Sequence, residues 1–382
     1  MKKIIIVLYL SLSGLWATLF SPDMLTNVVV AAETIKVAAI MAKSGEAIQQ
    51  LEGDTTPALV GIRYAIEDIN KQGGVLGKQI ELLEFDNKSM AIGAKLAAEE
   101  AVKAGVVAIL GDVWSSHSLA VAPVAQAAKI PMISPMSTNP KVTLVGDYIF
   151  RVCFIDPFQG LVMANFAVDD LKAKSAVVLT NTTEAYSMGL ADFFKDKFKQ
   201  KGGEILWEGD YLSKTTDFTA LLEKIKSLNP NVIFIPGAAR ESSYIIKQSR
   251  EMGIKSTFLG GDAWFEAMWK YSGDAVEGSY YSSHWHPDIA NELSKKFIQD
   301  HNYTSAKAGV TLGYDAGMLL ADAIRRANSF EPTQIRNAIA STQNFQGLTG
   351  KISFDSNRDP IKSAVILKFE KKKIVYYKSV EP

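Results

Sequence analysis

The sequence predicts an α/β protein built from two similar doubly wound lobes, each a parallel sheet with helices on both faces. Two observations carry this prediction. Short runs of β-branched residues alternate with longer segments of helical period along most of the chain, which is typical of parallel sheets. The pattern of one half recurs about 130 residues later, which indicates two lobes of one design. A length of 382 residues is consistent with two such lobes.

The internal repeat is visible in two kinds of landmark. A glycine pair ends an expected helix in each half, at positions 73–74 and 202–203. A buried apolar run ends in glycine in each half, at 107–111 and 233–237. The matching order of these landmarks predicts matching topologies.

In the first half, strands are expected at five short apolar runs: 35–41, 80–86, 106–110, 132–134 and 148–152. Helices are expected where apolar residues recur every three or four positions: 58–70, 91–104 and a segment within 116–129. Gly105 ends the second of these helices. Pro123 lies inside the third helix, so we expect a kink there or a later start.

The second half follows the same alternation. Its expected strands are 176–180, 205–211, 232–236 and 257–259, and its expected helices are 184–201, 218–228 and 241–252. The remaining residues form no third lobe: they hold helices at 289–301, 312–327 and 333–340, then strands at 351–354, 364–369 and 374–377. This composition suits a chain that returns to complete both lobes, with several crossings that act as a hinge.

The N-terminus has the pattern of a secretory signal peptide. Two lysines precede an apolar run at 4–20, and small residues at 30–32 fit a cleavage site. We therefore assign residues 1–32 to a signal peptide, with an uncleaved membrane anchor as the alternative. The only cysteine is Cys153, so no lipid can be attached at the cleavage point. The mature protein is expected free in the periplasm.

Composition excludes several classes of function. Lys and Arg total 41, Asp and Glu total 41, and the basic residues are scattered, so no nucleic-acid partner is expected. One cysteine allows neither an internal disulfide nor a zinc site with several Cys ligands. His284 and His286 are a weak metal signal without a third ligand, and no phosphate-binding or hydrolase motif follows an expected strand. We expect no metal, no cofactor and no enzyme.

The candidate site lies in the loops beyond the carboxyl ends of the strands, where parallel sheets bind ligands. In the first lobe these loops carry hydroxyl groups that suit an anion: Ser115, Ser116, Ser137 and Thr138. In the second lobe, Tyr186 and Asp262 suit an ammonium group. An anion site opposite a cation site describes an α-amino acid. The alternative is that Ser115 or Ser116 only caps its helix and that Asp262 is an N-cap.

Several longer motifs resemble one family. They are the runs 69–74, 111–116 and 130–140, the pair Ala122-Pro123 and the pattern Phe150-Arg151…Asp156…Gln159-Gly160. They resemble the periplasmic solute-binding proteins of branched-chain amino acid ABC transporters, over nearly all of the mature chain. The resemblance implies the type I periplasmic binding protein fold, with two lobes joined by a three-crossover hinge. It places lobe 1 at 33–154 plus 283–360 and lobe 2 at 155–282 plus 361–382.

The resemblance also implies roles for individual residues. Ser115 and Thr138 match the family's carboxylate-binding serine and threonine, and Tyr186 matches its cleft tyrosine. Asp262 matches the ammonium-binding acid, which is Glu in the leucine/isoleucine/valine binders. Met136 would offer a backbone carbonyl near the ammonium group.

The wall of the side-chain pocket departs from the family pattern. Aromatic residues of the leucine/isoleucine/valine binders fall at Gln50, Ala238 and Gly309 here, while Trp114 and Trp264 appear instead. The pocket is therefore expected to be rebuilt, for a larger or more polar amino acid. Gln50 and Arg240 are candidate contacts to its side chain.

The resemblance implies an extracytoplasmic receptor of an ABC importer that binds an amino acid and performs no covalent chemistry. It is expected to be a monomer and to dock on a permease at the inner membrane. A sensor of the same fold that feeds a signalling partner is the first alternative, and a binder of another small carboxylate or amide is the second. An exported enzyme is the third, although the cleft loops hold no histidine except His117.

Overall fold

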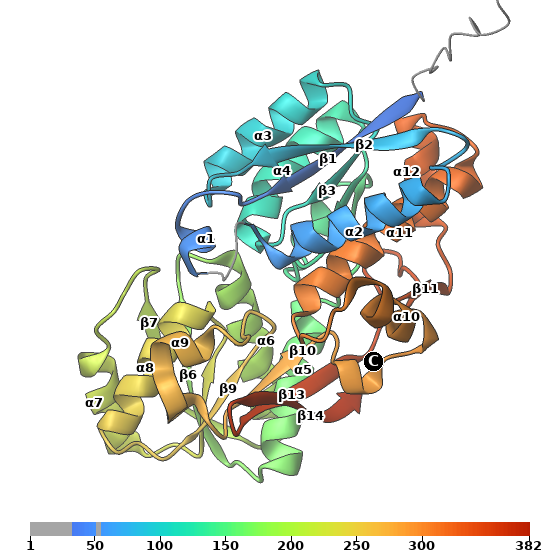
Figure 1. Ribbon diagram of the computed structural model, residues 1–382. Helices are drawn as coiled ribbons and strands as arrows, with labels where there is room; N and C mark the ends of the chain where they lie inside the picture. Colours follow the sequence, from blue (N-terminus) through green and yellow to red (C-terminus); the bar gives the residue numbers. More distant parts are fainter. Residues whose placement is uncertain (1–32, 51–54) are drawn as a thin grey trace, which may run out of the picture. The chain divides into compact units, whose positions relative to one another are not determined.

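The computed structural model describes residues 33–50 and 55–382 (Figure 1). The predicted signal peptide, residues 1–32, lies outside the described residues. Residues 34–382 form one compact unit with two large sheets, one of five strands and one of seven. We call the part built around the five-stranded sheet the first lobe and the part built around the seven-stranded sheet the second lobe. The predicted α/β class with two lobes is confirmed.

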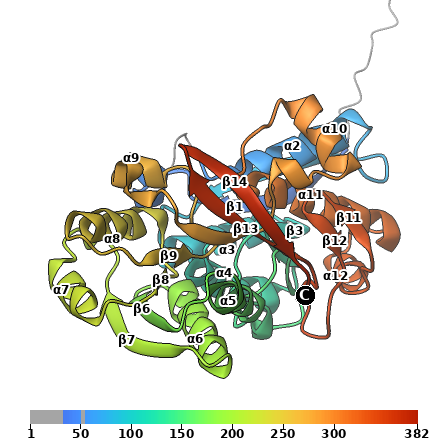
Figure 2. The same cartoon turned by 90° about the horizontal axis from the view of Figure 1, so that it is seen from below.

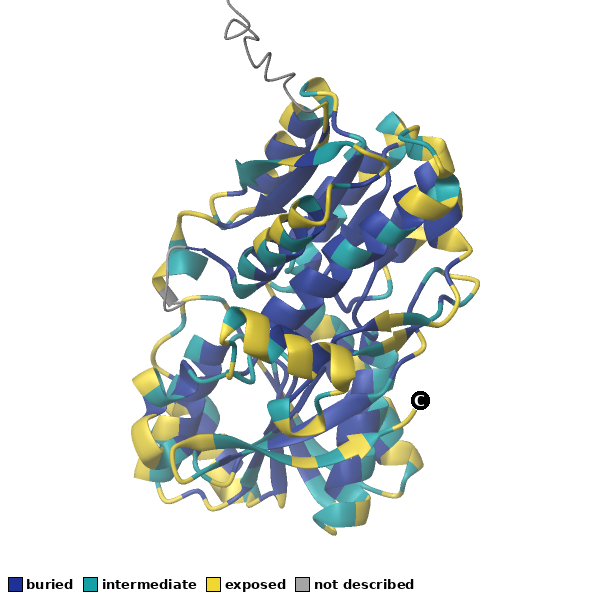
Figure 3. Ribbon diagram, turned by 45° about the vertical axis from the view of Figure 1, so that its right-hand side comes forward, coloured by how far each residue is buried: buried dark blue, intermediate teal, exposed yellow. Residues whose placement is uncertain are grey.

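The first sheet is entirely parallel, in the order β2-β1-β3-β4-β5. Its strands are β1 (Thr34–Met41), β2 (Gln79–Asp86), β3 (Ala108–Gly111), β4 (Met132–Ser134) and β5 (Ile149–Arg151). One face packs against α2 (Pro57–Lys71), α11 (Ala308–Ala327) and α12 (Pro332–Ala340). The other packs against α3 (Ala91–Lys103) and α4 (Ser115–Ala128). Because both faces are covered, the strands β3, β4 and β5 and most of β1 are buried, as Figure 3 shows, whereas the edge strand β2 is only partly buried.

The second sheet has the order β14-β13-β10-β9-β8-β6-β7. Its parallel strands are β6 (Ser175–Asn181), β7 (Glu204–Tyr211), β8 (Val232–Ile235), β9 (Thr257–Gly260) and β10 (Tyr280–Ser283). The antiparallel strands β13 (Ala364–Glu370) and β14 (Lys373–Val380) complete one edge (Figure 2). Helices α5 (Asp156–Asn165) and α6 (Ala185–Gln200) cover one face, and α7 (Thr219–Leu228) and α8 (Ala239–Glu251) the other.

The chain passes between the two sheets three times, after β5, after β10 and before β13. The second passage leads to α10 (Glu292–His301), which packs against the first lobe. The third follows a small separate hairpin of β11 (Phe345–Gly347) and β12 (Gly350–Ile352). The described residues also form two short α-helices, α1 (Glu46–Gln50) and α9 (Met268–Ser272). The exact lobe boundaries stay a prediction.

Helix α4 differs from its prediction. It begins at Ser115, one residue before the expected segment, and it continues through Pro123 rather than starting after it. Pro123 is exposed, so the carbonyl group one turn earlier that loses its hydrogen-bond partner lies on the solvent side of the helix. Ser115 is therefore in the first turn, where free backbone N–H groups are found.

Strand β10 and helix α5 were not expected from the sequence. Strand β10 reads Tyr-Tyr-Ser-Ser, so it lacks the apolar β-branched run that marks the other central strands. Its serines are buried all the same, and Ser282 donates a hydrogen bond to Gln159 of α5 (3.0 Å). These two elements meet where the chain passes between the lobes. They are held there by a hydrogen bond between polar side chains, and β10 has no apolar run that would predict it.

Candidate functional site

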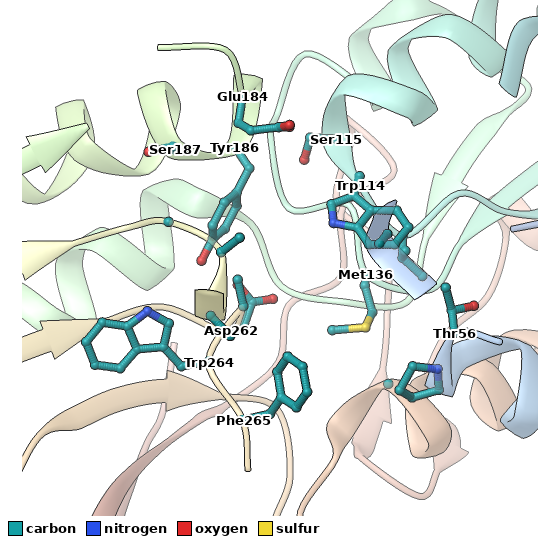
Figure 4. Close-up of a pocket in the computed structure, with 18 of the residues that line it drawn as sticks. Thr56, Trp114, Ser115, Met136, Glu184, Tyr186, Ser187, Asp262, Trp264 and Phe265 are labelled. Atoms are coloured by element: carbon teal, nitrogen blue, oxygen red, sulfur yellow. The ribbon is translucent and has the colours of Figure 1, made fainter. Parts of the chain in front are cut away.

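A cavity of about 480 Å³ lies between the two lobes, beyond the carboxyl ends of their parallel strands. Both lobes contribute to its wall, as the close-up in Figure 4 shows. Seven of the predicted site residues line it: Trp114, Ser115, Met136, Tyr186, Ala238, Asp262 and Trp264. The topology thus brings together residues up to 150 positions apart in the sequence.

Ser115 lies at the start of α4, where the sequence predicts an anion site. Its Oγ accepts a hydrogen bond from the backbone N–H of Asn139 (3.3 Å), which leaves its hydroxyl hydrogen free to be donated. Trp114 occupies the N-cap position and makes no side-chain cap bond, so neither Ser115 nor Ser116 caps this helix. The first turn holds no acidic residue, and its partial positive charge favours an anion.

Asp262 presents a fixed carboxylate on the opposite wall. One oxygen, Oδ1, accepts a hydrogen bond from Gln159 Nε2 (3.0 Å), and Oδ2 lies 2.9 Å from His284 Nε2. The backbone N–H of Asp262 also donates to Gln159 Oε1 (3.0 Å). Asp262 is not an N-cap, because the next helix, α9, begins six residues later. The carboxylate is 5% exposed, so a cation in the cavity would meet a largely desolvated partner.

His284 holds Asp262 from the passage between the lobes. Burial lowers the pKa of His284, although the Asp262 carboxylate opposes this shift. The neutral ring donates from Nε2 to Asp262, because a carboxylate only accepts hydrogen bonds. The ring also stacks on Phe154, with centroids 3.7 Å apart. Sequence reasoning treated His284 only as a weak metal ligand, and the described residues hold no cluster that fits a metal ion.

Asp156 is a second buried acid near this wall. Burial raises its pKa to about 8, with the Asp262 carboxylate adding to the shift and the Thr138 hydroxyl opposing it. Its backbone N–H donates to the carbonyl of Thr138 (3.0 Å). Thr138 itself is buried behind the cavity wall rather than lining it. The sequence placed Asp156 in a family motif but assigned it no role.

Tyr186 lies on α6 beside Asp262, with its hydroxyl turned towards the Asp262 loop (Figure 4). Burial raises the pKa of Tyr186 well above its usual value, and the carboxylates of Asp262 and Asp156 add to the shift. The phenol therefore stays neutral, and its ring is available to pack against a ligand.

Two predicted serines lie outside the cavity wall. Ser137 Oγ lies 2.6 Å from Ser118 Oγ and donates to the carbonyl of Asp112 (3.1 Å), so it fastens the loops after β3 and β4 to each other. Ser116 instead contacts Glu184 and Ala185 of the second lobe.

The remaining cavity wall includes the aromatic rings of Trp114, Trp264 and Phe265. Trp114 of the first lobe and Phe265 of the second both line it, with Met136 between them in Figure 4. Ala238 and Gly309 also line the cavity, where small side chains leave room. Gln50 closes α1, but its side chain lies outside the described residues.

Charged residues lie near the mouth of the cavity, and of these the sequence singled out only Arg240, as a candidate contact to the ligand side chain. Glu46 of α1 pairs with Lys214 (2.8 Å) and with Arg240 (2.9 Å), both from the second lobe. Arg240 also pairs with Glu241 (2.8 Å), and it does not itself line the cavity. The two pairs of Glu46 join residues far apart in the sequence, so no local pattern could have shown them.

The comparison with known families decides the relationship. Residues 34–373 match the model of a family described as periplasmic binding protein. The chain belongs to this family. Its members bind solutes and are not enzymes, which confirms the predicted class. Among the described residues, no helix combines the length and hydropathy needed to cross a bilayer.

Individual relatives are similar along most of the binding protein. A Leu/Ile/Val-binding protein homolog 1 of Brucella melitensis is 32% identical over 326 residues, which cover 81% of this chain and 85% of the relative. The leucine-specific-binding protein of Salmonella typhimurium is 28% identical and covers 80% of this chain and 82% of its own length.

Solved structures agree with the fold. The leucine binding protein LivK of Thermotoga maritima is 38% identical, with a TM-score of 0.86, covering 91% of this chain and 99% of that one. The branched-chain amino acid transporter substrate binding protein LivJ of Streptococcus pneumoniae, in complex with isoleucine, is 29% identical with a TM-score of 0.85. It covers 92% of this chain and all of that one. The predicted resemblance and the type I fold are confirmed.

Proposed function

We propose that this protein is the extracytoplasmic receptor of an ABC importer and that it binds an α-amino acid between its lobes. The observation that carries the proposal is the pairing of opposite charge preferences across one cavity. The start of α4 favours an anion, and the fixed Asp262 carboxylate faces it from the other lobe. The relatives named for leucine, isoleucine and valine support this ligand class.

In the proposed complex, the ligand carboxylate receives hydrogen bonds from the Ser115 hydroxyl and from backbone N–H groups of the first turn of α4. The ammonium group pairs with Asp262, and the Tyr186 ring packs beside it. The side chain extends towards Trp114 and Phe265. Thr138 does not line the cavity, so in this complex it supports the wall through its backbone bond to Asp156 instead of the predicted contact with the carboxylate.

The wider role follows from the fold. We propose lobe boundaries at 33–154 plus 283–360 and 155–282 plus 361–382, so that the three passages act as the hinge. Closure on the ligand presents both lobes to a permease at the inner membrane of the periplasm, and the receptor acts as a monomer. Export removes residues 1–32.

Isothermal titration calorimetry of purified residues 33–382 with each of the twenty L-amino acids tests the proposal. We expect one amino acid, or a small group of similar ones, to bind with a 1:1 stoichiometry. No heat of binding with any of the twenty would contradict it. Binding of carboxylic acids that lack an amino group, with none of the twenty, would place the protein among binders of other small carboxylates.

A further inference from the structure

A set of hydrogen bonds joins the lobes directly at the start of α6. Ser116 Oγ accepts a hydrogen bond from the backbone N–H of Ala185 (3.1 Å) and donates to Glu184 Oε2 (3.0 Å). Asn139 Nδ2 donates to the carbonyl of Ala185 (2.7 Å). Ser116 and Asn139 belong to the first lobe, and Glu184 and Ala185 belong to the second. We call these four residues the closure contact.

The closure contact supplies the N-terminal cap that α6 does not receive from its own N-cap residue. Ala185 is the first residue of α6, and its N–H is one of the donors that a helix start leaves without an internal partner. Glu184 is the N-cap residue of α6, but its side chain makes no cap bond. Ser116 takes that place from the other lobe, so it caps α6 only while the lobes are together.

The closure contact is also connected to the predicted anion site. The backbone N–H of Asn139 donates to Ser115 Oγ (3.3 Å). The carbonyl of Asn139 accepts from the buried Arg151 (2.9 Å), and its Oδ1 accepts from the backbone N–H of Lys141 (3.0 Å). Asn139 is therefore held firmly while it contacts Ser115 on one side and the second lobe on the other.

Ser116 does not line the cavity, and its hydroxyl already uses one donor and one acceptor within the closure contact. Glu184 does line the cavity, with its carboxylate turned towards the start of α4 in Figure 4. Its bond to Ser116 is the contact that keeps this acid turned to the first lobe. Burial raises the pKa of Glu184; the charge of Glu241 on α8 adds to this shift, and that of His117 on α4 opposes it.

We propose that Ser116, Asn139 and Glu184 are positioning residues that set ligand affinity by stabilising the closed state, without Ser116 or Asn139 touching the ligand. This rests on the proposed function, since it takes a ligand in the cavity as given. A contact present only in the closed state changes the affinity for every ligand by one common factor. A contact with the ligand itself changes affinity by a factor that depends on the ligand.

The test compares Ser116→Ala with Ser116→Thr, which keeps the hydroxyl group, and adds Glu184→Ala and the double variant. The affinities of L-leucine, L-isoleucine and L-phenylalanine are measured by calorimetry. Ser116→Ala is expected to lower the affinity for every ligand that binds by about fivefold to tenfold, with one common ratio for all of them. Ser116→Thr is expected to restore most of this loss. The double variant is expected to lose less than the product of the two single losses. A loss confined to one ligand, or no loss, would overturn the proposal.

A second measurement needs no ligand. Spin labels on Lys103→Cys and Lys226→Cys, exposed positions on α3 and α7, report the distance between the lobes, while the buried Cys153 stays unlabelled. Ser116→Ala is expected to shift the ligand-free distances towards the open form, and an unchanged distribution would overturn the closure contact. If none of the three amino acids binds, the proposed function loses support while these distances still decide the closure contact.

Discussion

The two walls of the cavity offer different chemistry for binding charge. The first-lobe wall uses neutral donors, the Ser115 hydroxyl and the free N–H groups at the start of α4. The second-lobe wall uses a carboxylate, Asp262, held by Gln159 and His284. The donors of the first wall come from one short stretch of sequence, whereas Asp262 and its two partners come from three distant segments. The second should therefore respond more strongly to single substitutions, because a buried charge depends on each of its partners.

The largest effect is expected for Asp262→Ala. It removes the partner of a largely desolvated ammonium group, so the affinity for the best-binding amino acid should fall by about 100-fold or more. Calorimetry measures the loss, and thermal unfolding confirms that the variant is folded. Asp274→Ala, a largely exposed acid of the same lobe that pairs with Lys372 and not with the first lobe, is the control. An affinity within twofold of the unmodified protein would remove Asp262 from the site.

A smaller effect is expected on the first wall. Ser115→Ala deletes one neutral donor but leaves the N–H groups of α4 in place, so affinity should fall by about tenfold. Ser213→Ala, which removes a hydroxyl that also lines the cavity, should change affinity by less than about twofold. If Ser115→Ala reduced the ligand affinity more than Asp262→Ala does, the first wall would be the more sensitive one, and the expected order of the two walls would be wrong.

Asp156 should make the free energy of unfolding depend on pH. Its pKa is raised to about 8 by burial, so between about pH 4 and pH 8 the folded state binds more protons than the unfolded state. The free energy of unfolding should therefore fall as pH rises through this window. Asp156→Asn removes this contribution, and at pH 8 it should be more stable than the unmodified protein by about 1 kcal/mol or more.

Urea unfolding at pH 5 and pH 8, without ligand, measures this difference. The advantage of Asp156→Asn should be larger at pH 8 than at pH 5. The exposed Asp196→Asn should show no such pH dependence. If Asp156→Asn stabilised the protein by the same free energy at pH 5 and at pH 8, Asp156 would be ionised at both pH values.

The smallest effect is expected at the mouth of the cavity. Glu46→Gln breaks the ion pairs with Lys214 and Arg240, which are partly exposed and screened by salt. Affinity should fall by at most about threefold in low salt, and the difference should shrink in 0.5 M salt. Calorimetry at two salt concentrations measures it, and a salt-independent loss would show that Glu46 acts through the ligand instead.

The difference between the walls also explains what the sequence could predict. The alternation of strands and helices is a local signal, and it correctly located the parallel strands from β1 to β9 and the serine at the start of α4. Strand β10 was missed because it lacks an apolar run, and its buried Ser282 is satisfied by Gln159 on another element. The partners of Asp262 were missed for the same reason, since nothing near position 262 points to His284.

Ser116 is a case in which the sequence predicted the position of a residue but not its partner. The sequence correctly placed it at the start of a helix, where a hydroxyl group suits an anion, but its side chain does not line the cavity. Its partner is nevertheless a backbone N–H of the opposite lobe, and only the arrangement of the two lobes reveals this. Local patterns predict what a side chain offers, while its actual partner depends on distant packing.

The most direct test of the charged second wall compares two ligands that differ by a single group. The best-binding amino acid and the carboxylic acid that lacks only its amino group are titrated into the unmodified protein by calorimetry. If Asp262 pairs with the ammonium group, the amino acid should bind at least about 100-fold more tightly than its analogue. Equal affinities would mean that the second wall does not recognise an ammonium group, and the assignment of an amino acid as the ligand would be wrong.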